Sequence, residues 1–214
     1  MSSVVDLIVL ANSAKKNERC IAGIDRSTGD WVRPVGPRGD GEVCFSLRNV
    51  NGKEPQVLDV VRMELGDSAE THGFQLENRT IVARPWQLVG RAEVDDILRF
   101  RCGERYVFFD GNDRIRHADL TDKIACRSSL QLWETWNFQC FEDTNSRGTK
   151  RWKGRFSIIG GRTMSLVIKD VEYEKRLKQN HQPSEHALIL VSLGVPFTPD
   201  TWTEPHCWKL IATV

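Results

Sequence analysis

The sequence lacks the short motifs that identify most metal proteins and nucleotide-hydrolysing enzymes. It contains no CxxC, HxxxH or HExxH spacing, no Walker A or GxGxxG loop and no GxSxG nucleophile motif. Asp95 and Asp96 would diverge by about 100° on a helix, which is poor geometry for a general acid–base pair. We therefore predict no metal, no cofactor and no local catalytic site. A nuclease assembled from scattered carboxylates around Mg²⁺ stays open as an alternative.

Closely spaced cysteines, an export signal and long apolar runs are also missing. The six cysteines lie at least 14 residues apart, and without an export signal this spacing indicates reduced thiols. The N-terminal apolar run has no basic residues before it, and Asp6 interrupts it. We therefore expect a buried strand from Val4 to Leu10 instead of a signal peptide. Since no run approaches the roughly 20 apolar residues that cross a bilayer, the sequence predicts a cytoplasmic protein with no membrane partner.

Net charge is nearly absent. The 214 residues include 30 Lys and Arg against 29 Asp and Glu, which gives +1 at neutral pH. This balance excludes a generic basic coat for nucleic acid, so any surface for a polyanion must come from a local cluster. The length allows one large domain or two small ones.

Short β-strands account for most of the readable pattern. β-branched and aromatic residues gather in runs bounded by turn residues, and RSTGD between two such runs predicts a hairpin. Beyond Val4–Leu10, the expected strands are Arg19–Asp25, Trp31–Val35, Val57–Leu65, Arg105–Asp110, Arg155–Ile159, Thr163–Arg176 (one strand, or a bent strand crossing two), His186–Gly194 and Cys207–Val214.

Helical pattern is thin. Ala92–Phe100 places Val94, Ile97 and Leu98 on one helical face, whereas Ser128–Phe138 fits both period two and period three. Recurring strands with one or two short helices predict a mainly β protein. They indicate small barrels or sandwiches and not βαβ units.

Two stretches at opposite ends of the chain resemble a known family. LIVLANSAKKNERCIAGID followed by WVRPVG lies near the N-terminus, and LVSLGVPF followed by CWKLIATV lies at the C-terminus. Together they resemble the bacterial dual OB-domain family, and Trp208 supplies the aromatic residue expected there after Cys207. The resemblance implies two tandem OB-like β-barrels: residues 1–85 as the first barrel, 86–103 as a connecting segment with a short helix, and 104–214 as the second barrel.

The resemblance also implies where a ligand would lie. OB barrels bind single strands or oligosaccharides on the face of their second and third strands, between flanking loops. Relatives of this kind imply a role alongside other proteins in prokaryotic defence systems. Because fold does not determine function, the residues themselves have to carry the functional argument.

A basic and aromatic cluster in the second half is the first candidate for a binding surface. In SRGTKRWKGRFSI (146–158), Ser146 and Gly148 indicate a loop that leads into the strand from Arg155. Bases of a single strand stack on aromatic rings while Lys and Arg hold the phosphates. The competing interpretation is a solvated charged loop with its Trp packed inward. The candidate residues are Arg147, Lys150, Arg151, Trp152, Lys153, Arg155 and Phe156.

The first barrel offers a second candidate. Trp31 and Arg33 lie two residues apart and therefore on one face of a strand, where they could stack a base and hold its phosphate. The alternative is a Trp at the edge of the core beside a solvated Arg. The remaining candidates are the basic residues Lys15, Lys16, Arg19 and Arg38 in the neighbouring loops and strand.

From these observations we predict a noncatalytic nucleic-acid-binding module whose partner is single-stranded DNA or RNA. The first alternative is a protein-interaction subunit of a larger complex. The second is a nuclease or nucleotide hydrolase.

Overall fold

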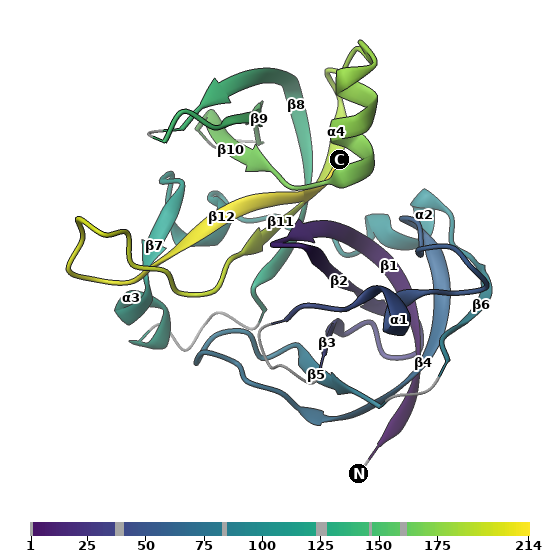
Figure 1. Cartoon of the computed structure of the whole chain (residues 1–214). Coiled ribbons are helices and arrows are strands. Elements are labelled where there is room, and N and C mark those ends of the chain that lie inside the picture. The colour runs from purple at the N-terminus through teal and green to yellow at the C-terminus, as the bar shows by residue number, and fades with distance from the viewer. Residues whose placement is uncertain (1, 37–40, 83–84, 123–127, 146, 159–161) are drawn as a thin grey trace. The chain divides into compact units, whose positions relative to one another are not determined.

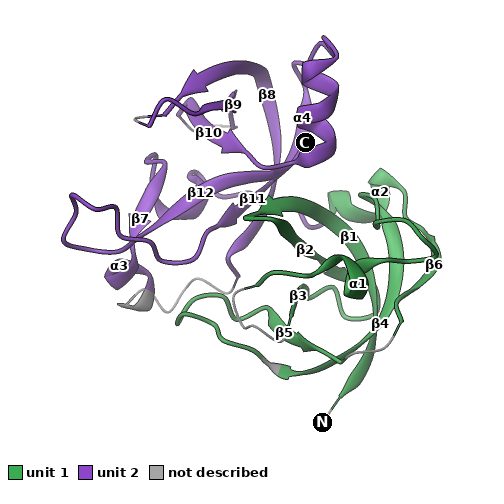
Figure 2. Ribbon diagram, in the orientation of Figure 1, with its two compact units in different colours: residues 1–99 green, residues 100–214 purple. Residues whose placement is uncertain are grey.

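The chain forms two compact units, Met1–Arg99 and Phe100–Val214, in a computed structural model (Figures 1 and 2). The structure describes residues 2–36, 41–82, 85–122, 128–145, 147–158 and 162–214. It is mainly β, and each unit contains a closed five-stranded barrel. This confirms the predicted fold class, although the described residues form four short α-helices where one or two were expected.

The first unit is a barrel with one additional strand. Its strands follow the order β1-β2-β3-β5-β4-β6, and a β1–β4 pairing closes the ring while β6 lies outside it on β4. The pairing of β3 with β5 is parallel. The elements are β1 (Ser3–Lys15), β2 (Glu18–Asp25), β3 (Trp31–Val35), α1 (Phe45–Arg48), β4 (Asp59–Ser68), β5 (Asn78–Ile81), β6 (Gln87–Arg91) and α2 (Val94–Leu98).

Alternation along these strands builds the core of the first barrel. Leu7 and Val9 on β1 point to the same side because they are two residues apart, and both are buried. Ile21, Val32 and Val61 join them from β2, β3 and β4. The predicted strands Val4–Leu10, Arg19–Asp25 and Trp31–Val35 are therefore confirmed.

The second unit repeats the same barrel. Its sheet order is β10-β9-β8-β11-β12-β7, and a parallel β10–β12 pairing closes the ring. The ambiguous segment 128–138 belongs to the long strand β8. The elements are η1 (Val107–Phe109), β7 (Arg114–Arg116), α3 (His117–Asp122), β8 (Leu130–Thr144), β9 (Lys150–Ser157), β10 (Met164–Ile168), α4 (Val171–Lys178), β11 (Ala187–Leu193) and β12 (His206–Thr213).

The expected strand Arg105–Asp110 is wrong. Residues 107–109 form a short 3-10 turn, and Phe108 and Phe109 take positive φ values of 45° and 71°. The ammonium of Lys209, which is 1% exposed, donates hydrogen bonds to the carbonyl oxygens of Val107 and Asp110 at 2.7 and 2.9 Å. A buried charge needs such acceptors, and gathering them overrides the β propensity of the segment.

The expected strand Thr163–Arg176 is correct only in its first part. After β10 the chain turns into α4, because the Asp170 side chain accepts a hydrogen bond from the backbone N–H of Tyr173 at 3.0 Å and caps the helix. Tyr173 and Leu177, four residues apart, are buried on one face of this helix. No helix in the described part of the chain has the length and apolar character needed to cross a membrane.

Candidate nucleic-acid interface

The basic residues of the second unit lie on a strand and not in a loop, as their neighbours Ser146 and Gly148 had suggested. The strand β9 already begins at Lys150 and pairs with β8 from Thr144. The turn before it is closed by Asn145, whose side-chain oxygen accepts hydrogen bonds from the N–H groups of Arg147 and Thr149, both at 2.9 Å. Because β9 is the second strand of its barrel, it contributes to the face on which OB barrels bind their ligands.

Gly154 determines which side of β9 faces the barrel interior. A Cβ atom at this position would lie 2.7 Å from Ile211 Cδ1 and 2.8 Å from Phe138 Cε2. Phe156, two residues further on, is 0% exposed. Since successive side chains alternate, Arg151, Lys153 and Arg155 must point outward.

These three cations, which we call the outer row, have an aromatic neighbour. Opposite Lys153 on β8 lies Phe141, and the Arg155 guanidinium sits 5.1 Å from the centre of its ring. On the other side, Val167 of β10 pairs with Lys153. The face therefore combines three cations with aromatic and aliphatic surface, which are the two kinds of contact that a single strand uses. The sequence analysis did not select Phe141.

One carboxylate lies among the outer row. Asp143 accepts a hydrogen bond from Arg151 at 2.8 Å and forms an ion pair with Lys153 at 3.1 Å. The hydrogen bonds from Arg151 and Lys153 hold the pKa of Asp143 below its ordinary value, so it stays ionised at neutral pH. Three cations against one anion leave a local charge of 3 − 1 = +2. Exposed ion pairs of this kind are weak, about 0–1 kcal/mol, so a phosphate can compete for both cations.

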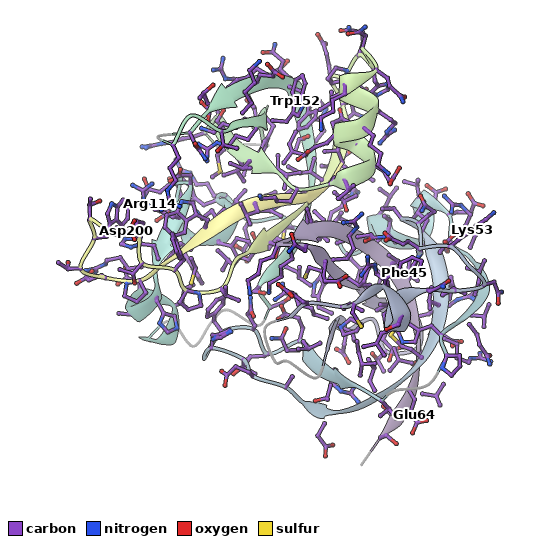
Figure 3. The ribbon with its side chains drawn as sticks, in the orientation of Figure 1. Phe45, Lys53, Glu64, Arg114, Trp152 and Asp200 are labelled. Atoms are coloured by element: carbon purple, nitrogen blue, oxygen red, sulfur yellow. The ribbon has the colours of Figure 1, made fainter. Side chains whose placement is uncertain are left out.

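Trp152 and Lys150 occupy the other side of β9. Both alternate with the outer row, and their partners on β8 are Glu142 and Thr144; Lys150 forms an ion pair with Glu142 at 3.3 Å. A base stacked on Trp152 (labelled in Figure 3) would therefore lie across the strand from phosphates on the outer row. Phe156 is a correction to the predicted site, because it is a core residue and cannot reach a ligand.

An aromatic cluster follows on the loop before β12. Trp202 lies 6.0 Å from Trp208 and 4.7 Å from His206, measured between ring centres. The guanidinium of Arg114, on β7, lies 4.6 Å from the centre of the Trp202 ring, and Phe197 at the cluster's margin is 53% exposed. The sequence analysis noted only Trp208; a Trp in a loop between Pro199 and Pro205 was the signal that could have revealed Trp202.

The strand register connects this cluster with the outer row. Val167 of β10 pairs both with Lys153 and with Leu210 of β12, and Trp208 lies two residues from Leu210 on the same face. Neighbouring strands are about 4.8 Å apart, so the path from β9 to β12 spans only about 10 Å. The two flanking loops also meet, because Arg147 forms an ion pair with Asp200 at 3.4 Å.

The candidates in the first unit do not gather in the same way. Lys16 forms an ion pair with Glu42 at 3.3 Å, and Arg19 forms one with Glu54 at 3.2 Å. Lys15 and Trp31 are half-buried, and Arg38 lies outside the described residues.

Arg33 is the second correction to the predicted site. Its side chain shares a face of β3 with Trp31, as expected, but it is 2% exposed and forms a buried ion pair with Glu77 at 3.2 Å. A guanidinium held in this way is not available to a phosphate at the surface.

Within the described ranges, no three His, Cys, Asp or Glu side chains come together as a metal-ligand set. The Asp95–Asp96 pair serves a structural purpose, since the Asp96 carboxylate accepts a hydrogen bond from the N–H of Glu93 at 2.9 Å at the start of α2.

Two OB barrels in tandem define the class of this protein. Comparison with known families agrees: a family model described as a dual OB-containing domain matches residues 5–214, so the chain belongs to the dual OB-containing domain family. No curated protein and no solved structure was found to match it.

Proposed function

We propose that the second unit binds single-stranded nucleic acid on the outer face of β9. Arg151, Lys153 and Arg155 hold successive phosphates, while Phe141 and the cluster around Trp202 stack bases. The observation that carries this proposal is the outer row itself: three cations on the ligand-binding strand of an OB barrel with a single carboxylate among them. The family resemblance adds a proposed setting, a nucleic-acid-holding component of a prokaryotic defence complex.

The salt dependence of binding tests the outer row. Fluorescence anisotropy with labelled oligo-dT and oligo-U should show an affinity that falls with salt, because each phosphate contact releases counterions. Replacing Arg151, Lys153 and Arg155 together by Ala should lower the log–log slope by about 2, at roughly 0.7 for each contact. The matched control replaces three exposed cations of α4, Lys175, Arg176 and Lys178, and should leave the slope unchanged.

Single aromatic variants separate stacking from charge. Phe141→Ala or Trp202→Ala should weaken binding by about 1–3 kcal/mol and leave the salt slope nearly constant. The proposal is wrong if the wild-type protein binds neither oligonucleotide at low salt, or if the α4 control lowers the slope as much as the outer-row variant. Degradation of the oligonucleotides that depends on Mg²⁺ would instead support a nuclease.

A further inference from the structure

β6 ends the sheet of the first unit as an exposed edge strand. In the described part of the chain it pairs only with β4. All five of its residues are exposed, including the apolar Leu88 at 53% and Val89 at 39%. The outer edge of such a strand presents backbone N–H and C=O groups that can pair with an added strand.

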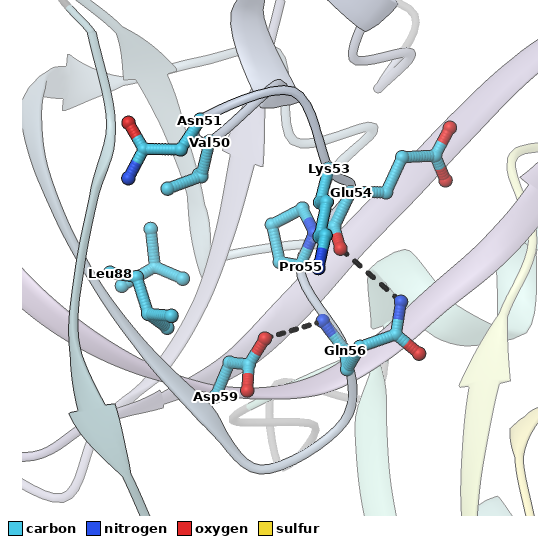
Figure 4. Close-up of a pocket in the computed structure, with 9 residues that line it drawn as sticks. Val50, Asn51, Lys53, Glu54, Pro55, Gln56, Asp59 and Leu88 are labelled. Atoms are coloured by element: carbon cyan, nitrogen blue, oxygen red, sulfur yellow. Dashed lines mark hydrogen bonds between the residues drawn. The ribbon is translucent and has the colours of Figure 1, made fainter.

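A cavity of about 590 Å³ opens beside this strand (Figure 4). Its apolar lining comes from Val50 and Pro55 on the loop before β4, from Val61 on β4 and from Leu88 on β6. Val61 and Leu88 are direct partners in the β4–β6 register and therefore lie on the same side of the sheet. The volume falls within the range of ligand sites, about 300–1,000 Å³.

The charges around the cavity leave one cation uncompensated. Glu54 accepts a hydrogen bond from Arg48 at 2.9 Å, and Asp59 accepts one from Arg91 at 2.9 Å. Both carboxylates are thus neutralised by arginines. Lys53 is exposed and forms no ion pair with any residue that the structure describes. An aliphatic cavity with a cation at its rim suits a carboxylate that is attached to an aliphatic side chain.

We propose that β6 and this cavity bind the C-terminal segment of a partner protein that ends in an aliphatic residue. The segment adds a strand to β6, its last side chain fills the cavity, and its terminal carboxylate pairs with Lys53. A peptide terminus offers all three contacts at once. A free aliphatic acid shares the carboxylate and the side chain but cannot use the strand edge. This site shares no residue with the proposed nucleic-acid interface, so each can fail without the other.

Three probes distinguish these contacts: the pentapeptide Thr-Val-Thr-Val-Leu with a free carboxylate, its C-terminal amide, and N-acetyl-leucine. At millimolar concentration the free-acid peptide should shift the NMR methyl signals of Val50, Val61 and Leu88. The amide should bind about tenfold more weakly, since it loses a charged hydrogen bond. N-acetyl-leucine should bind more weakly than the peptide, because it makes no strand contacts.

Two variants with matched controls complete the test. Lys53→Gln should weaken the free-acid peptide about tenfold and leave the amide unchanged, whereas Lys178→Gln, an exposed lysine of the second unit, should alter neither. Leu88→Ala should weaken all three probes, and Leu76→Ala, at 57% exposure, none of them. The proposal is overturned if the peptide moves none of the three methyl signals, if acid and amide bind equally, or if N-acetyl-leucine binds as tightly as the peptide. Oligonucleotide binding by Lys53→Gln, measured in parallel, reports on the other site separately.

Discussion

The Asp143 carboxylate competes with phosphate for the outer row. It pairs with Arg151 and Lys153, and hydrogen bonds from these two residues lower its pKa. This pairing is present above the lowered pKa and is lost only as the pH falls through it. We therefore expect that acidification from neutral pH to about pH 5 brings no gain in oligonucleotide affinity from the protonation of Asp143.

Removal of this charge should strengthen binding. Asp143→Asn keeps the side-chain shape and frees both cations, so oligonucleotide affinity at low salt should rise severalfold. Glu142→Gln is the matched control, because Glu142 pairs with Lys150 on the other side of the strand. Anisotropy titrations of the two variants provide the comparison. Equal tightening by both would mean that only the overall charge matters.

Arg33 and Lys209 show a limit of reasoning from single residues. Both are cations in a sequence where cations are usually solvated, yet both are buried, one beside Glu77 and the other among the carbonyl oxygens of Val107 and Asp110. Each partner lies far away in the sequence, and no local pattern announces it.

At the scale of the elements, the strand β9 depends on a glycine. Gly154→Ala would place a methyl group 2.7 Å from Ile211 Cδ1 and 2.8 Å from Phe138 Cε2. Overpacking of this kind costs about 1–3 kcal/mol of folding free energy, measurable by urea unfolding. Gly103→Ala is the control, since a Cβ there meets nothing within 4 Å. If both variants unfold at the wild-type urea concentration, the packing of β9 against Phe138 is not as described.

The elements that the sequence predicted well are those with a clear period of two. The strands at residues 19–25 and 31–35 agree with β2 and β3 almost residue for residue. In β9 the same period is hidden, because Lys150 and Trp152 on the inner side are as polar or amphipathic as the outer row. The capped helix α4 was missed, because β-branched residues just before it extended the strand pattern.

At the scale of the whole molecule, the cysteines report on both the core and the redox state. Cys207 is 0% exposed, and burial raises its pKa to about 12; burial, with the nearby charge of Glu104, does the same for Cys102. Since the thiolate is the reactive form, both should react slowly with an alkylating reagent in the folded protein, and faster after denaturation. All six thiols should then react, as counted by mass spectrometry. A pair that stays protected in denaturant would contradict the expectation of reduced cysteines.

The sequence by itself determined the fold class and the position of the basic cluster. Alternation within a strand is a local property that depends only on neighbouring residues, and the family motifs at the two ends extend it to two barrels. The tertiary structure alone decided which of these residues face a ligand. Barrel closure and strand register place Trp152 on the opposite side of β9 from Arg151, bury Arg33 beside Glu77, and bring Arg114 onto Trp202. These pairings join residues far apart in the chain, so they depend on packing and are absent from any local pattern.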